Sequence, residues 1–149
     1  MWMNIIFGLI IPWIPGIYLI KKDLKIFLLI APFASVVAFT FDVLGFHMEF
    51  WRISPEREIE TVAALPMYLG VYPILAAYLF FFIKRSHLNR WILIFAVTLI
   101  TTIIEFIGVS IDMVHYFNGW NIFWTFVSYL LAYLVSYGYF LILKKHVDV

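Results

Sequence analysis

The chain has no cysteine and little charge, and both absences narrow what it can be. Without cysteine there is no disulfide, no iron–sulfur cluster and no thiolate zinc site. Charged residues make up 13% of the chain, against roughly 25% in a soluble domain. The formal net charge is +1, and no basic patch of the kind that neutralises phosphates is present. Nucleic acid is therefore not an expected partner.

Apolar residues dominate instead, at 65% of the 149 residues. A soluble domain averages roughly 45–50% apolar residues, and a small domain buries only a limited part of its surface. We therefore expect the excess apolar surface to face lipid. No positively charged segment precedes the first apolar stretch, and no small-x-small cleavage site precedes Lys21. The first stretch is expected to be retained rather than removed as a signal peptide.

Five apolar stretches follow one another, each near the ~20 residues with which a helix crosses the hydrocarbon core. They are Trp2–Ile20, Ile26–Phe46, Thr61–Ile83, Trp91–Met113 and Ile122–Leu143. Transmembrane β-strands would be about half as long and would alternate in polarity, which these stretches do not. The predicted fold class is an all-α membrane protein, with five transmembrane helices in one domain over residues 1–149.

Basic residues are unevenly divided between the two sides of this arrangement. One side holds eight of them: Lys21, Lys22, Lys25, Lys84, Arg85, Arg90, Lys144 and Lys145. The other side holds only Arg52 and Arg57. Because cytoplasmic loops carry an excess of Lys and Arg, we expect a multi-pass protein of the cytoplasmic membrane, with its N-terminus outside and its C-terminus in the cytoplasm. If the first stretch only re-enters the membrane, the N-terminus is cytoplasmic instead.

Proline and glycine interrupt two of the stretches. The first contains Pro12 and Pro15, and the third contains Pro66, Gly70 and Pro73. Each proline removes a backbone hydrogen bond and kinks a helix. Transporters build binding sites from such broken helices, whereas the simpler interpretation is a kink that improves packing. The sequence leaves both interpretations open.

Asp42 and Glu105 are the most informative residues, because each lies inside an apolar stretch. A charge at the membrane centre costs at least ~2.5–3.5 kcal/mol and marks a functional site by default. Its simpler role is an interhelical hydrogen bond from a protonated carboxyl. At about 1.5 Å per residue the two acids lie at similar depth and can meet. Asp42 also shares a helix face with Ser35 and Glu49, seven residues away on either side.

Further polar residues collect at the outer ends of spans two, three and four. We expect five of them to form the entrance to a ligand-binding or proton-binding site around the two acids: His47, Glu60, Asp112, His115 and Asn118. Asp112 and His115 have the i, i+3 spacing that places both on one helix face. No HExxH or comparable signature is present, so we expect a solvated acidic rim, with neither a metal site nor a cofactor.

The outer loops also contain helix and turn signals. Ser54 followed by Pro55 and acidic residues predicts that the third helix begins near Pro55. Asn118–Gly119 predicts a tight turn, and Asn121 is expected to cap the last helix. Trp51 is expected to anchor the chain at the membrane interface.

The last span carries two stripes. Ser128, Ala132 and Ser136 form a small-xxx-small seam suited to close packing, against this bundle or against another chain. Tyrosines form an adjacent ladder at positions 129, 133 and 137. Buried tyrosines usually pack with the hydroxyl satisfied by a neighbour, and we expect packing here.

These features together resemble two families. Asp42 followed by Trp51, the proline-containing third span, Glu105 and the run Tyr116–Asn121 resemble a family of small uncharacterised multi-pass membrane proteins of endospore-forming bacteria. The likeness covers about residues 41–143, and it implies a cytoplasmic-membrane protein without implying a reaction. Asp42 followed by Trp51 is also similar to part of the pattern of small membrane-embedded carotenoid and terpenoid cyclases. That likeness implies an intramembrane acid that protonates a polyene.

Three functions fit these observations. The first is an outward-facing acidic cavity in the bilayer that binds or transports a small cationic or amphiphilic ligand, with Asp42 and Glu105 as its protonatable or cation-pairing groups. The second is a membrane-embedded lipid- or isoprenoid-modifying enzyme, with one of these acids as general acid and aromatic rings stabilising a carbocation. The third is a non-catalytic subunit, in a homo-oligomer or a larger membrane complex. Transport predicts a water-accessible path, the enzyme an aromatic pocket open to lipid, and the subunit fully paired acids.

Overall fold

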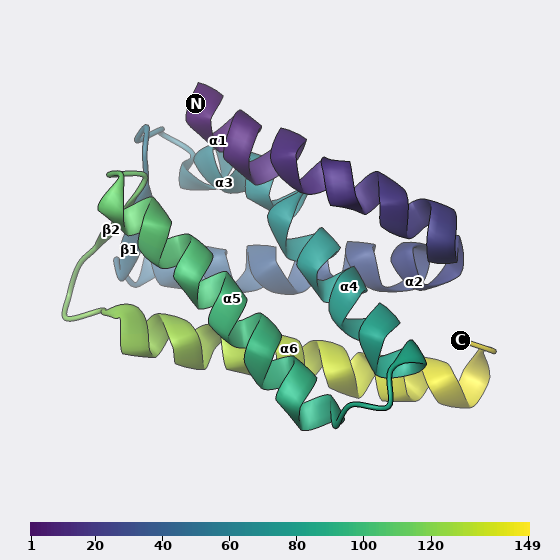
Figure 1. Ribbon diagram of the computed structural model, residues 1–149. Coiled ribbons are helices and arrows are strands. Elements are labelled where there is room, and N and C mark those ends of the chain that lie inside the picture. Colours follow the sequence, from purple (N-terminus) through teal and green to yellow (C-terminus); the bar gives the residue numbers. More distant parts are fainter.

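The computed structural model describes residues 1–149, and its helices are arranged as a bundle (Figure 1). Four helical segments are long and apolar enough to cross a membrane. The elements are α1 (Trp2–Ile5), the π-helical turn η1 (Ile6–Ile10), α2 (Ile11–His47), β1 (Trp51–Ile53), α3 (Glu60–Tyr68), α4 (Val71–Arg85), α5 (Arg90–Ser110), β2 (Val114–Tyr116) and α6 (Ile122–His146). Only 22% of the most apolar window is buried in α5 and in α6. Most of their apolar surface therefore faces outward, as in a membrane protein.

The first helical segment folds back on itself at Asp23. The backbone leaves the helical region there, at φ −156° and ψ 75°. The Asp23 carboxylate accepts a hydrogen bond of 3.1 Å from the Ile26 N–H, as an N-cap does, and forms ion pairs with Lys84 and Arg85 at 3.1 and 3.5 Å. Figure 1 shows residues 2–22, here the first arm, running to one end of the bundle and residues 24–47, the second arm, returning from it.

The predicted break in the third segment is confirmed, since α3 ends and α4 begins on either side of Leu69 and Gly70. Pro73 has no N–H to donate to the Leu69 carbonyl, and the Trp13 indole N–H of the first arm donates to it at 2.8 Å instead. A Cβ at Gly70 would lie 2.8 Å from the Cα of Leu9. The first arm therefore crosses the break in direct contact with the backbone of the third segment.

A short antiparallel β-ladder, which the sequence does not predict, closes one end of the otherwise helical bundle. β1 pairs with β2 in a register that sets Arg52 opposite His115. Neighbouring backbone groups extend the pairing, since the Ser54 N–H donates to the Met113 carbonyl at 2.9 Å. Loops 63 residues apart in sequence thus form one cap (Figure 1).

The cap also displaces two predicted helix ends. The third helix begins at Glu60 rather than near Pro55, because Ser54 is bound to the cap and its hydroxyl shares a hydrogen bond of 2.9 Å with the His115 ring. α5 ends at Ser110 rather than Met113, and Asp112 turns the chain with φ 58°. The Asn118–Gly119 turn is confirmed by φ values of 49° and 78°, and Asn121 caps α6 as predicted.

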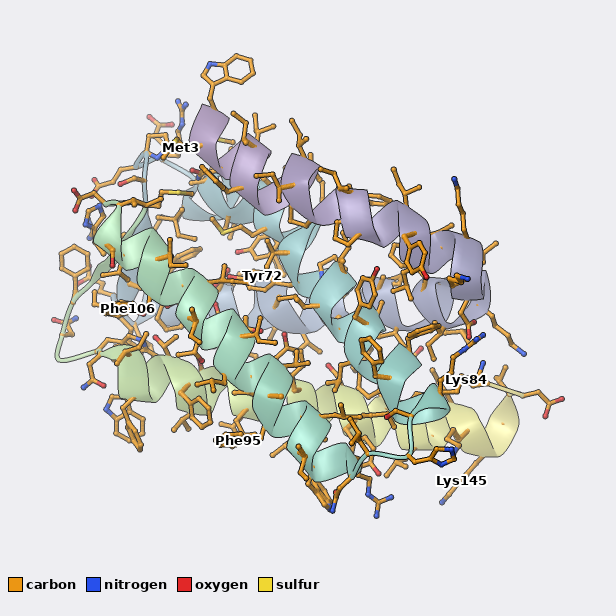
Figure 2. All side chains as sticks on the ribbon, in the orientation of Figure 1. Met3, Tyr72, Lys84, Phe95, Phe106 and Lys145 are labelled. Atoms are coloured by element: carbon orange, nitrogen blue, oxygen red, sulfur yellow. The ribbon has the colours of Figure 1, made fainter.

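The two ends of the bundle differ in character. The turn at Asp23, the α4–α5 loop and the C-terminus lie together at the end opposite the cap, and Figure 2 labels Lys84 and Lys145 there. The largest apolar cluster fills the neighbouring half, where the rings of Phe80 and Phe140 lie 4.9 Å apart. Asp42 and Glu105 lie in the other half, toward the cap, where they bind Trp51 and Tyr116 of the two strands.

Candidate functional site

Two cavities meet between the helices in the half of the bundle nearer the cap. The larger has a volume of about 750 Å³ and lies between the first arm, α4 and α5. The smaller has a volume of about 50 Å³ and lies between the second arm, α4 and α6. Five residues line both cavities, and we call them the polar partition: Asp42, Trp51, Tyr72, Glu105 and Tyr129. Figure 2 labels Tyr72 near the centre of the molecule.

Glu105 is fully paired by hydroxyl groups. Its Oε1 accepts hydrogen bonds from the Tyr116 hydroxyl at 2.7 Å and from Thr125 Oγ1 at 3.1 Å. Its Oε2 accepts one from the Tyr129 hydroxyl. Burial, and then the neighbouring Glu105, raise the pKa of the Tyr116 phenol above its ordinary value. Tyr116 therefore stays a hydroxyl donor, and β2 and α6 together hold the Glu105 carboxyl in place.

Asp42 is only half paired. Its Oδ1 accepts a hydrogen bond of 3.1 Å from the Trp51 indole N–H, whereas its Oδ2 is buried without a partner. The residue is 8% exposed. The buried Tyr68 hydroxyl lies beside the Asp42 carboxyl and faces it as a donor, at a geometry looser than that of a normal hydrogen bond. Asp42 and Glu105 line the same cavities, but every hydrogen bond that either makes goes to another residue.

Trp51 is a member of the site, a role that its sequence position does not predict. Its ring packs 4.8 Å from that of Trp120 and 6.3 Å from that of Phe46, measured between ring centroids. Room for the indole exists because Gly45 has no side chain, since a Cβ there would lie 2.5 Å from Trp51 Cε2. β1 and the end of the second arm therefore aim the indole N–H at Asp42.

The five predicted entrance residues lie around the cap and line neither cavity: His47, Glu60, Asp112, His115 and Asn118. Asp112 and His115 do not share a helix face, because α5 ends before them and His115 belongs to β2. Asn118 donates a hydrogen bond of 3.2 Å to the Glu49 carbonyl and links the two loops of the cap. No three His, Asp or Glu side chains are grouped to hold a metal ion.

Arg52 gathers the acidic residues of the rim. Its guanidinium lies 3.7 Å from Glu49, 3.7 Å from Glu56 and 4.0 Å from Glu60. All of these side chains are more than a third exposed, and exposed ion pairs contribute little to stability. The rim is thus a partly neutralised surface above the cap rather than the lining of the cavity.

Sequence reasoning missed the hydroxyl groups that complete the site. Tyr129 belongs to the ladder that is expected to pack with its hydroxyls satisfied by neighbours, and its hydroxyl does bind Glu105 and share a 3.2 Å hydrogen bond with the Tyr72 hydroxyl. The sequence did not identify these partners. Helical spacing does place Tyr129 and Tyr133 on one face, and that was the available signal. The adjacent seam of small residues lines the smaller cavity, inside its own bundle, with Ser128, Ala132 and Ser136.

The comparisons with known proteins give no relative. No protein-family model, curated protein or solved structure matches this chain. The resemblances that rest on Asp42, Trp51 and Glu105 therefore stay predictions. What the arrangement offers chemically is a half-paired carboxyl, beside a fully paired one, at the junction of a large apolar cavity and a smaller one.

Proposed function

We propose that the chain crosses the membrane five times, with the N-terminus outside and the C-terminus in the cytoplasm. The first helical segment supports two crossings, because its arms of residues 2–22 and 24–47 are each about 30 Å or more in length. The three turns and ends that carry the eight basic residues lie at one end of the bundle. That end would be the cytoplasmic side.

We further propose that the larger cavity binds an amphiphile that enters sideways from the bilayer, with its polar head at Asp42. The observation that carries this function is the unpartnered Asp42 Oδ2, buried where the two cavities meet. A buried polar atom without a partner costs free energy. A ligand that donates a hydrogen bond to this oxygen would recover that cost on binding.

The surroundings of the cavity favour a lipid-side entrance over a water-filled path. The β-ladder and the stacked rings of Phe50 and Trp120, 4.8 Å apart, lie over the end toward the cap. The lining is largely apolar, and on the flank between the first arm and α5 several lining side chains are also exposed at the surface, among them Phe7 at 48% and Ile107 at 53%. In a bilayer, an opening on this flank would face lipid.

Two observations support a second candidate, the acid-catalysed modification of an isoprenoid. The first is the opening toward lipid on the flank of the bundle, which this hypothesis requires. The second is that the free oxygen of Asp42 lies among Trp51, Tyr72 and Tyr129, and aromatic rings of this kind stabilise cations. The subunit hypothesis is less well supported, since it required both acids to be fully paired and only Glu105 is.

The test is native mass spectrometry of the protein purified from membranes. We expect a bound small molecule on the wild type, its loss from Asp42→Asn, and its retention by Asp112→Asn, an acid outside the cavities. The mass of the released molecule distinguishes a bound amphiphile from a cyclised product. Equal occupancy of the two variants would contradict the proposal.

A second pair of variants tests the cavity itself. Ile104 and Ile103 are neighbours on α5 with similar exposure, 41% and 50%, and only Ile104 lines the larger cavity. Ile104→Trp should fill the cavity and displace the ligand, whereas Ile103→Trp should change only the lipid-facing surface. Retention of the ligand by Ile104→Trp would place it outside this cavity.

A further inference from the structure

The hydrogen bonds of the polar partition have a fixed direction, because a hydroxyl group carries one hydrogen atom. Tyr129 donates its hydrogen to Glu105. In the 3.2 Å contact between the Tyr72 and Tyr129 hydroxyls, Tyr72 must therefore be the donor. Both tyrosines consequently have no hydrogen left for a ligand, and only oxygen lone pairs remain available.

The hydroxyl groups of α6 that line the smaller cavity have also already donated their hydrogen atoms. Thr101 donates to the Val97 carbonyl at 2.8 Å, so Tyr133 is the donor in its 2.7 Å contact with Thr101. The hydroxyls of Ser128 and Ser136 also donate to backbone carbonyls of their own helix, at 2.8 and 2.9 Å. Each of these hydroxyls can still accept a hydrogen bond, and none can donate one.

The remaining donors are likewise occupied. The Trp51 indole donates to Asp42, and the Trp120 indole donates to Thr125 at 2.9 Å. The Thr125 hydroxyl in turn donates within the Glu105 cluster, and Tyr78, in the larger cavity, donates to the Pro15 carbonyl at 2.7 Å. With both carboxyl groups ionised, every side-chain donor that lines either cavity is thus already used. The remaining hydroxyl near Asp42, that of Tyr68, faces the Asp42 carboxyl and lines neither cavity.

We infer that the head group of the ligand is a protonated amine, an inference that rests on the proposed binding of an amphiphile. The partition offers two carboxyl groups, of which Asp42 has a free oxygen, and several hydroxyl lone pairs. It therefore suits a head that only donates hydrogen bonds. A phosphate, sulfate or carboxylate head would find no donor and would face Asp42 and Glu105. A quaternary ammonium head would carry the right charge but would leave Asp42 Oδ2 without a hydrogen.

The experiment compares four probes with one chain and different heads: dodecylamine, dodecyltrimethylammonium, dodecanol and dodecyl phosphate. Binding to the purified full-length protein in maltoside micelles is titrated by native mass spectrometry. We expect the amine to bind about tenfold or more tightly than each of the others, as the extra charge-assisted hydrogen bond implies. Asp42→Asn should abolish that preference, and Asp112→Asn should keep it.

Two contrary outcomes are distinguishable. If the phosphate or the quaternary ammonium binds as tightly as the amine, and Ile104→Trp still removes that binding while Ile103→Trp does not, the amine head is wrong and the cavity stands. If Ile104→Trp and Ile103→Trp bind all four probes as the wild type does, the cavity is not the binding site, and both the proposed function and the amine head are overturned.

Discussion

Substitution of Gly45 by alanine tests whether the packing of one ring holds the site together. A Cβ at this position would lie 2.5 Å from Trp51 Cε2, whereas carbon atoms normally approach to about 3.5 Å. The ring would have to move by about 1 Å or more, away from its 3.1 Å hydrogen bond to Asp42. Overpacking costs about 1–3 kcal/mol, and a side-chain hydrogen bond within a membrane protein about 0.6–1.7 kcal/mol. We expect a total loss of about 2–4 kcal/mol in the free energy of unfolding.

The assay is equilibrium unfolding of the protein in mixed micelles, followed by circular dichroism, with Gly138→Ala as the matched control. Nothing lies within 4 Å of a Cβ at Gly138, so that variant should be neutral or up to about 1 kcal/mol more stable, because alanine favours helix over glycine. In a Trp51→Phe background, which lacks the indole, Gly45→Ala should cost markedly less than it does in the wild type. Equal stability of the Gly45→Ala and Gly138→Ala proteins, or additive effects in the double variant, would refute the packing described for Trp51.

Two further predictions concern the helices themselves. Gly70→Ala should destabilise the protein by about 1–3 kcal/mol in the same unfolding assay, because its Cβ would lie 2.8 and 2.9 Å from backbone atoms of Leu9 and Gly8; a neutral result would mean that the first arm does not cross at this break. Reporter fusions should place the end after Val149 in the cytoplasm and the end before Met1 outside, and the two ends on one side would contradict five crossings.

Much of the fold follows from local pattern, and the sequence therefore predicts it. The apolar segments, the break at Gly70 and the Asn121 cap depend on hydropathy, proline chemistry and neighbouring backbone groups. The β-ladder could not be foreseen, because Trp51–Ile53 and Val114–Tyr116 are too short to show a strand pattern and are brought together only by the folded bundle. That pairing also takes up the segment that the sequence pattern predicts to be the start of a helix.

The same distinction between local pattern and tertiary contacts applies to the residues of the site. Asp42 and Glu105 could be identified because a carboxyl in an apolar segment is rare at any rotation of its helix. Their partners depend on how each helix is rotated, which hydropathy does not fix, so the contacts of Tyr129 with Glu105 and of Trp51 with Asp42 could not be derived. The entrance residues were predicted from their polarity and their position at the ends of the spans, and His115 illustrates the result. It lies at the predicted end of the bundle but binds Ser54.

The cap formed by β1 and β2 has a consequence for how affinity should be measured. If the proposed ligand reaches its site only through the flank of the bundle, the concentration that governs occupancy is its mole fraction in the surrounding lipid, not its molarity in water. Each methylene added to such a ligand favours the membrane by about 0.8 kcal/mol, or about fourfold. A series of ligands of increasing chain length would then show rising affinity, expressed as a concentration in water, without any new contact to the protein. Affinities measured at different lipid-to-protein ratios would disagree for the same reason.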